Sequence, residues 1–435
     1  MRIIDKTKEF WNKEKGEAKK NLLKLILAVP FWIIVAALIL IAFGVGRAVY
    51  LTDTRPDQYV AEAWQNGGET SYRHMTVYAS GIRNGGDTTP MTYVDGGKSI
   101  RLADITDMRK ALQSSASTGS EGSSKGTFRE DRLKGWEDCY SSTVIAKLEA
   151  MEVKDGMEVT TGTADTQLVA VGGNYRAFHP FRFLSGGFLP ETPVDTYQIV
   201  INDVLAWKFY RSYNVVGNRI IINGQMFTII GVVEEKNTKV AELAGEQSYR
   251  AFIYFGALET IFKNTSADDS GYGDYADYGD FTDDSSYYSG TGSNYLDYSI
   301  QCYEAMLPEL VKGVAVSDFK NAIPNYSLTN PQVYVANNTG RFGVFRVFDT
   351  MFPLGETAKE RLGYEFPYWE IAAQMTEERL FYDYVIVGLG IILILIGSVM
   401  IGLKFRARKA VSDAELDDDD TDDNEAEDKE LALKA

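Results

Sequence analysis

The side chains with the most chemical capacity are scarce in this 435-residue sequence, which holds two cysteines and two histidines. Cys139 and Cys302 both lie in the long region between two apolar runs, and an extracytoplasmic location of that region would permit a disulfide between them. The sequence gives no distance between the two thiols, so a Cys139–Cys302 disulfide and two buried free thiols remain equal alternatives. His74 and His179 do not stand at a zinc-binding spacing from the cysteines. We therefore predict neither a histidine-based metal site nor a catalytic triad.

Short catalytic and nucleotide-binding motifs are also missing or incomplete. The sequence contains no G-x-S-x-G and no H-E-x-x-H. Gly97-Lys98-Ser99 matches the end of a phosphate-binding loop, but Thr92 stands where the first glycine is required. Gly271 to Ala276 matches G-x-G-x-x-A without a preceding strand pattern. We predict a protein that is not an enzyme, with no catalytic residues, no cofactor and no metal ligands.

An acidic tract between residues 264 and 294 has two interpretations. It is rich in Gly, Asp, Tyr and Ser, and its carboxylates could form a weak calcium site, since calcium prefers several oxygen ligands. The fixed spacing of a calcium-binding loop is absent, and such compositions are typical of solvated, disordered insertions. We therefore predict a disordered insertion over residues 264–294.

Two apolar runs enclose the middle region of the sequence and must position any functional residues in it. Leu25 to Val45 and Tyr384 to Leu403 contain no charged residue, and each would form a helix about 30 Å long, the thickness of the hydrocarbon core of a bilayer. A signal peptide is the alternative for the first run, but the run is too long and lacks a small-x-small cleavage pattern. We predict transmembrane helices at residues 25–45 and 384–403.

The charges beside these runs predict the orientation. Lysines and arginines crowd residues 1–24 and follow the second run at Lys404, Arg406, Arg408 and Lys409, and basic flanks stay in the cytoplasm. Residues 1–24 and 404–435 are therefore predicted as cytoplasmic segments of a two-pass plasma-membrane protein, with residues 46–380 extracytoplasmic. The formal net charge is -17. Part of it lies in the tail after Asp413, which we expect to be disordered, and the lack of other basic clusters argues against nucleic-acid binding.

Within the middle region, two segments have the order strand, helix, strand. The first comprises a strand at 72–79, a helix at 98–112 and a strand at 142–153, with a flexible Ser/Gly-rich loop at 114–126. The second comprises a strand at 298–306, a short helix from Ser317 to Ala322 capped by that serine, and a strand at 333–335. The shared order suggests a structural duplication.

The clearest local signal lies between these segments. Asn223-Gly224 separates two β-branched runs, 219–222 and 225–233, and Asn-Gly favours a hairpin because a type I′ turn needs positive φ at both central residues. Residues 200–210 fit a helix opened by Asn202 or Asp203, and a glycine-punctuated turn covers residues 183–188.

The segment before the second apolar run predicts a stalk. Residues 364–381 alternate apolar and acidic positions in the manner of an amphipathic helix, which would continue into the membrane. Within the membrane run, Gly390 and Gly397 share a face, and Ser398 and Gly402 form a small-x-x-x-small pair. Small residues let helices approach closely, so we expect a packing face for the first membrane helix or for another protein.

The stretch from Gly172 to Glu234 resembles the MacB-like periplasmic core domain of macrolide-exporter-type and FtsX-like ABC transporter permeases. The resemblance comprises, in order, aromatics at Tyr175 and Phe178, the Leu184-Ser185-Gly186-Gly187-Phe188 turn, a strand and helix from Ile199 to Phe209, Val216-Gly217, and the Asn-Gly hairpin. It implies an α+β fold, in which a porter-like α/β subdomain and a β-rich subdomain are anchored by two transmembrane helices. Such permeases have four membrane helices, whereas this sequence has two candidate runs.

The resemblance and the two runs together lead to two hypotheses for function. The first is a non-enzymatic membrane component related to ABC transporter permeases, whose exposed domain binds a ligand or partner and couples it to the membrane. Its partners would be the lipid bilayer, other membrane subunits or further copies of itself, and a separate cytoplasmic ATPase. The alternative is a membrane-anchored surface receptor, adhesin or assembly scaffold without a transport role.

Overall fold

A computed structural model describes residues 29–65, 71–79, 82–83, 92–93, 100–118, 136–154, 157–261, 300–309, 311–324, 333–351 and 366–434. The chain divides into two compact units. One unit, called here the sheet domain, comprises Thr52–Glu378; the other, the helical unit, comprises Met1–Leu51 and Arg379–Ala435. The predicted insertion at 264–294 and the cytoplasmic segment 1–24 lie outside the described residues.

One mixed sheet organises the sheet domain. Its order among the described residues is β12-β1-β11-β4-β5-β10-β7-β9-β6, with β8 paired to both β4 and β9. Most neighbours are antiparallel, while β10 with β5 and β7 with β9 are parallel. The strands are β1 (Ser71–Ala79), β4 (Glu137–Lys154), β5 (Met157–Gly173), β6 (Phe183–Gly186), β7 (Gln198–Asn202), β8 (Arg219–Ile222), β9 (Gln225–Val233), β10 (Arg250–Tyr254), β11 (Cys302–Glu309) and β12 (Val333–Asn337). A separate pair joins β2 (Ile82–Arg83) to β3 (Thr92–Tyr93).

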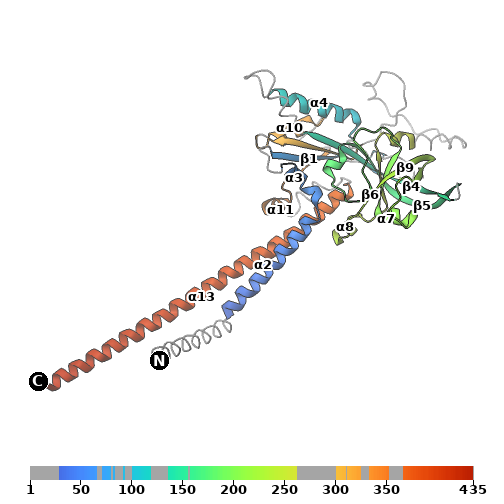
Figure 1. Ribbon diagram of the computed structural model, residues 1–435. Coiled ribbons are helices and arrows are strands. Elements are labelled where there is room, and N and C mark those ends of the chain that lie inside the picture. The colour runs from blue at the N-terminus through green and yellow to red at the C-terminus, as the bar shows by residue number, and fades with distance from the viewer. Residues whose placement is uncertain are drawn as a thin grey trace, which may run out of the picture. The chain divides into compact units, whose positions relative to one another are not determined.

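Helices cover both faces of this sheet, and strand alternation decides which side chain meets which layer. On β1, Met75 and Val77 point into a core that α4 (Leu102–Thr118), α7 (Asp203–Tyr210) and α10 (Val314–Ala322) complete. Tyr78 points the other way, into a core shared with α3 (Val60–Gln65), α6 (Tyr175–Phe178) and the start of α13 (Tyr368–Lys434). Figure 1 shows α4 and α10 on one side of β1 and α3 on the other. The predicted α+β fold class is confirmed.

Most of the predicted local elements are present. The turn predicted at 183–188 is instead mainly the strand β6, and the helix predicted at 200–210 begins at Asp203, because residues 200–202 belong to β7. Asn223 and Gly224 have φ of 48° and 77° and join β8 to β9, as the Asn-Gly hairpin prediction requires. Asn202 caps α7, because its side-chain oxygen accepts a hydrogen bond from the Leu205 amide at 3.0 Å. The two strand–helix–strand segments become β1–α4–β4 and β11–α10–β12, which interleave in the sheet because β11 lies between β1 and β4.

Two helix starts were predicted wrongly. Helix α10 begins at Val314 after Gly313, whose φ of 88° favours glycine, and Ser317 lies inside the helix instead of capping it. Helix α4 begins at Leu102 rather than Lys98, and Asp104 accepts a hydrogen bond from the Arg101 amide. It also continues to Thr118, into the segment predicted as a flexible loop. Serine and alanine there are compatible with a helix once packing of its earlier turns has established the axis.

The helical unit contains most of the two candidate membrane spans that the described residues include. Val29–Asp53 (α2) and Tyr368–Ala407 within α13 are long and apolar enough to cross a membrane. A Cβ added at Gly390 would lie 2.6 Å from Ile41 Cγ1, and one at Gly397 would lie 2.7 Å from Ile34 Cγ1. The prediction that the Gly390–Gly397 face packs on the first membrane helix is thus confirmed, whereas Gly402 has open space around it.

Helix α13 also continues through the acidic tail to Lys434. The tail was predicted to be disordered, but in the structure it is helical. The segment after Gly402 contains no glycine or proline and includes several alanine, glutamate, leucine and lysine residues, which favour helix.

Candidate functional site

Two chain segments connect the sheet domain to its apolar helices, and we call them the roots. The N-terminal root is residues 52–58, which include the η1 turn (Pro56–Gln58), and the C-terminal root is residues 368–378, the first turns of α13. The amphipathic stalk predicted at 364–381 is present from Tyr368 onward as the first part of α13, and residues 364–365 lie outside the described residues. Both roots carry charged side chains that are almost completely buried. Burial of charge is costly unless partners compensate for it, so these positions are candidates for function.

Arg341, which lies between β12 and α11 (Val344–Met351), is the central partner of the C-terminal root. Its Nη1 and Nη2 donate to the two oxygens of Glu370 at 2.6 and 2.7 Å, and its Nε donates to Glu377 Oε1 at 2.5 Å. Glu370 and Glu377 lie seven residues apart and so share one face of α13. Burial alone would lower the pKa of Arg341, but the charges of Glu370 and Glu377 raise it well above its ordinary value. The guanidinium therefore stays charged and holds two turns of the helix.

Neighbouring side chains complete this network. Tyr78 from β1 donates to Glu370 Oε2 at 3.0 Å, and Gln374 donates to Glu370 Oε1 at 2.8 Å. Arg341 Nη1 also donates to Gln58 of the N-terminal root at 3.2 Å. Burial, followed by the charge of Glu370, raises the pKa of Tyr78 well above its ordinary value, so the phenol remains a donor. The start of α13 is thus fixed to the sheet and to the other root.

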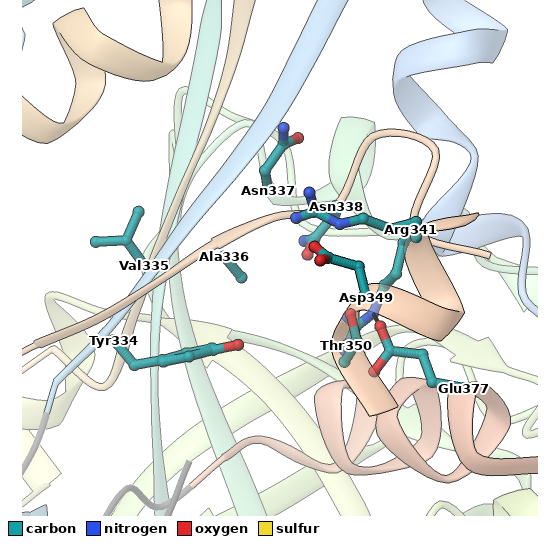
Figure 2. Close-up of a pocket in the computed structure, with 10 residues that line it drawn as sticks. Tyr334, Val335, Ala336, Asn337, Asn338, Arg341, Asp349, Thr350 and Glu377 are labelled. Atoms are coloured by element: carbon teal, nitrogen blue, oxygen red, sulfur yellow. Dashed lines mark hydrogen bonds and ion pairs between the residues drawn. The ribbon is translucent and has the colours of Figure 1, made fainter. Parts of the chain in front are cut away.

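A polar cavity of about 200 Å³ opens beside this network. Arg341 and Glu377 line it together with Asn338, Asp349 and Arg346. Figure 2 shows the polar ends of Asn338, Arg341 and Asp349 gathered in this cavity, with Tyr334 at its other end. The volume is below that of a typical drug-sized site, so the cavity suits only a small polar molecule or water.

The N-terminal root is built around Arg55 and Asp57. Arg55 forms an ion pair with Glu246, and both side chains are buried. Asp57 Oδ1 lies 2.7 Å from Lys236 Nζ. Burial alone would raise the pKa of Asp57, but the charge of Lys236, hydrogen bonds from Gln58 and Lys236, and the charge of Arg55 together hold it well below its ordinary value. The carboxylate therefore stays ionised at neutral pH.

A larger pocket, of about 440 Å³, lies between the N-terminal root and the start of α13 within the sheet domain. Asp57, Lys236 and Glu246 line one part of it, and His179, Tyr368 and Trp369 line another. Beside it, the buried guanidinium of Arg250 lies 3.4 Å from the centre of the Tyr368 ring and donates to Glu235 at 2.6 Å. This cation–π contact attaches the first residue of α13 to β10.

The same face of the sheet brings together both histidines and both cysteines of the chain. Glu304 on β11 is at the centre: His74 Nε2 lies 3.0 Å from its Oε1, and His179 Nε2 lies 2.7 Å from its Oε2. Cys139 Sγ lies 3.7 Å from Glu304 Oε2, and Cys302 is two residues before Glu304 on the same strand. All five side chains are buried. Spacing along the chain gave no sign of this cluster, because the strand register brings its members together.

The two cysteines are free thiols in the structure, one of the two alternatives that the sequence left open. Cys139 lies opposite Glu304, and Cys302 lies opposite Ser141, so the cysteines occupy diagonal positions on neighbouring strands. Diagonal Cα atoms are about 7–8 Å apart in such a pair, beyond the usual reach of a disulfide. Burial, followed by the charge of Glu304, raises the pKa of each thiol well above its ordinary value.

The roots were only partly visible in the sequence. Glu370 and Glu377 belong to the predicted amphipathic segment, but its pattern gave no sign that their carboxylates are buried. Arg341 carried no signal of its own, because its carboxylate partners are 29 and 36 residues away along the chain. A pair of acidic residues seven apart on an otherwise apolar helix is the one pattern that could have indicated a buried cation.

Comparison with known proteins agrees with the sequence resemblance. Residues 85–277 match the family model of the MacB-like periplasmic core domain. No curated protein matches the chain. The stretch Gly172 to Glu234, from which the resemblance was inferred, lies inside the matched residues.

Three solved structures have a limited similarity to this chain. The periplasmic region of MacB from Actinobacillus actinomycetemcomitans is 16% identical, with 61% of this chain and 88% of that chain covered at a TM-score of 0.32. The extracellular domain of the noncanonic ABC-type transporter YknZ from Gram-positive bacteria is 10% identical, with 60% and 100% covered at 0.32. A domain of a putative permease protein from Porphyromonas gingivalis is 12% identical, with 61% and 87% covered at 0.28. The family match over residues 85–277 relates this chain to MacB-like ABC transporter permeases.

Proposed function

We propose that this chain is a non-enzymatic membrane component whose sheet domain binds a ligand or partner and couples that event to its membrane helices. One observation supports the proposal above all. Helix α13 begins inside the Arg341–Glu370–Glu377 network and continues without interruption into an apolar span. A rigid helix that is anchored in a domain can transmit a change in that domain's state, whereas a flexible linker would dissipate it.

The proposed topology follows from the charge pattern. Residues 25–45 and 384–403 would cross the plasma membrane, residues 46–380 would face the extracytoplasmic side, and residues 1–24 and 404–435 would be cytoplasmic. The relation to MacB-like permeases and the two apolar helices both fit a membrane protein. Proteolysis of sealed, right-side-out vesicles tests this topology: the sheet domain should be degraded from outside, and protection of that domain would contradict the proposal.

The partners proposed are other membrane subunits or further copies of this chain, together with a separate cytoplasmic ATPase. Two membrane helices cannot by themselves enclose a solute path, so transport would require such an assembly. Purification from native membranes in mild detergent, with mass spectrometry and light scattering, tests this. The expected result is a defined complex that contains an ATPase. A strict monomer without associated proteins would contradict it.

Coupling is tested separately in the recovered complex. Arg55→Met should leave the complex intact and change its rate of ATP hydrolysis, because the substitution alters the N-terminal root without touching a nucleotide site. Val194→Ser, at a fully exposed position of the sheet domain, is the matched control and should leave the rate unchanged. Equal rates for wild type and Arg55→Met would remove the coupling step from the proposal.

A second candidate function is an anchored receptor, adhesin or assembly scaffold. It is favoured by the number of candidate spans, which is two among the described residues, compared with the four implied by the family resemblance. The acidic tail would then dock a basic cytoplasmic partner. A chain ending at Lys409 should lose that partner, and unchanged recovery of the partner would exclude docking by the tail.

A further inference from the structure

The cluster around Glu304 has the ligand types of a transition-metal site. Cys139 Sγ, His179 Nε2 and a Glu304 carboxylate oxygen all lie within 4.8 Å of one another. Sulfur, imidazole nitrogen and carboxylate oxygen are the three ligand types that zinc uses in proteins. The chain contains only two histidines and two cysteines, and all four gather at this one buried carboxylate.

The distances suit a four-coordinate ion after a small adjustment. Bonds of about 2.0 Å to nitrogen and oxygen and 2.3 Å to sulfur place tetrahedral ligand atoms roughly 3.3–3.6 Å apart. Cys139 Sγ to Glu304 Oε2 is 3.7 Å, and His179 Nε2 to the same oxygen is 2.7 Å. An ion therefore requires the His179 ring to move by about 0.6 Å, while the cysteine already stands at a suitable distance.

Charge and surroundings are also suitable. A divalent ion bound by one thiolate, one carboxylate and one neutral imidazole forms a neutral unit, which lowers the cost of burial. His74 lies 3.0 Å from the other oxygen of Glu304 and would orient the carboxylate. Tyr175 stacks on His179 at 4.2 Å, and Trp369 packs on its edge at 4.7 Å. These rings hold the imidazole from two sides.

The site also has an access path. His179 lines the 440 Å³ pocket, which is lined by five acidic side chains and by two lysine or arginine side chains. Four of these acidic side chains form ion pairs, with Arg55, Arg182, Lys236 and Arg250, so the mouth provides an entry path with little net charge. The acidic residues are Asp53, Asp57, Glu234, Glu235 and Glu246.

We propose that Cys139, His179 and Glu304 bind a divalent transition-metal ion, with zinc as the best fit, and that His74 is a positioning residue. Binding displaces the Cys139 thiol proton to solvent, requires the neutral His179 tautomer with its proton on Nδ1, and involves no redox change. The fourth ligand position remains for water. This site is independent of whether the chain takes part in transport.

Cobalt(II) provides the test, because a cobalt–thiolate bond has a strong near-ultraviolet charge-transfer band. The full-length chain, freed of affinity tags and dialysed against chelator, is titrated with Co²⁺ and then with Zn²⁺. We expect one equivalent of cobalt with this band, and loss of the band when zinc displaces cobalt. Weak binding at the acidic tail gives no such band. Absence of the band in the wild-type chain overturns the proposal.

Variants assign the ligands. Cys302→Ser is the matched control and should retain the band; because the chain has only two cysteines, its retention assigns the band to Cys139 even if Cys139→Ser does not fold. His74→Gln should keep the band but weaken cobalt affinity about 10- to 100-fold, the usual effect of an outer-shell partner. A band that disappears in Cys302→Ser, or persists in a folded Cys139→Ser, overturns the assignment.

Discussion

Each root of the sheet domain contacts a buried arginine, but the two roots compensate the charge of that arginine to different degrees. In the C-terminal root, Arg341 donates from all three of its nitrogens and has two carboxylate partners, Glu370 and Glu377. In the N-terminal root, Arg55 is as deeply buried but has one carboxylate partner, Glu246, and its Nε and Nη2 atoms have no partner among the described residues. Every nitrogen of the Arg341 guanidinium therefore has an acceptor, whereas two nitrogens of Arg55 have none among the described residues.

This difference indicates which root can rearrange. A buried, fully paired network has one low-energy arrangement, because any change exposes a charge without compensation. A cation with unused donors has alternatives, since a new acceptor or a water molecule could improve its state. We therefore expect the C-terminal root to act as the fixed attachment and the N-terminal root to carry the change when a ligand or partner binds.

The largest effect expected from this comparison is that of Arg341→Met. The variant leaves Glu370 and Glu377 buried without their cation, and breaking a buried ion pair from one side typically costs about 3–5 kcal/mol. Denaturant unfolding of the full chain in detergent, followed by far-ultraviolet circular dichroism, measures the loss. Arg346→Met is the matched control, because Arg346 lines the same cavity but is exposed, and its cost should stay within about 0.5 kcal/mol. Equal losses of unfolding free energy for the two variants would show that the Arg341–Glu370–Glu377 network does not stabilise the fold.

Substitutions at the N-terminal root should lower the free energy of unfolding by less, and the loss should differ between Arg55 and its partner Glu246. Arg55→Met removes two unpartnered donors together with the charge, so we expect a cost of about 1–3 kcal/mol. Glu246→Gln should cost more than Arg55→Met, because the buried guanidinium then loses the carboxylate with which it forms its ion pair. The same unfolding experiment compares them, and the double variant should recover part of the loss. A cost for Arg55→Met equal to that of Arg341→Met would end the distinction between the roots.

The sequence predicted features that depend on residues close together along the chain. It did not predict features that depend on residues far apart. The Asn223-Gly224 turn and the Asn202 cap depend on residues within three or four positions, so their signals were local and their predictions were confirmed. The Gly390–Gly397 face was also visible, because helix geometry alone places these glycines together.

The buried networks depend on strand register instead. His74 and Glu304 are 230 residues apart and meet because β1 pairs with β11. A one-residue shift of that register would turn every side chain of β1 to the other face. No pattern along the chain encodes such a shift, so neither the Glu304 cluster nor the Arg341 network could be derived from spacing. The composition did show that histidine and cysteine are scarce. Their convergence on the single carboxylate of Glu304 is therefore stronger support for a ligand site.

The two apolar helices, α2 and α13, also pack on each other, so this apolar contact can be compared with the ionic contacts of the roots. Gly390→Val should cost about 1–3 kcal/mol through overpacking, since its added Cβ would lie 2.6 Å from Ile41 Cγ1 and 3.1 Å from the Ala37 carbonyl oxygen. Energy transfer between labels on α2 and α13 should decrease in this variant. Gly388→Val is the matched control, because no atom lies within 4 Å of its added Cβ. Identical energy transfer in the two variants would show that the roots alone hold the helices together.

We expect the smallest effect from the pH dependence of the free energy of unfolding, which Asp57 of the N-terminal root should control. The folded-state pKa of Asp57 is depressed, so its contribution is present above its unfolded pKa of about 3.9 and disappears as the pH falls through the folded value. We expect Asp57→Asn to lower the free energy of unfolding at pH 7 by about 1 kcal/mol or less, since Lys236 is partly solvated. The two unfolding curves should converge below about pH 4. Asp107→Asn, which removes an exposed partner of Lys110, should change the unfolding free energy at neither pH. If Asp57→Asn loses the same stability at pH 3 as at pH 7, then the carboxylate acts through packing, and the charge of the N-terminal root has no part in its response.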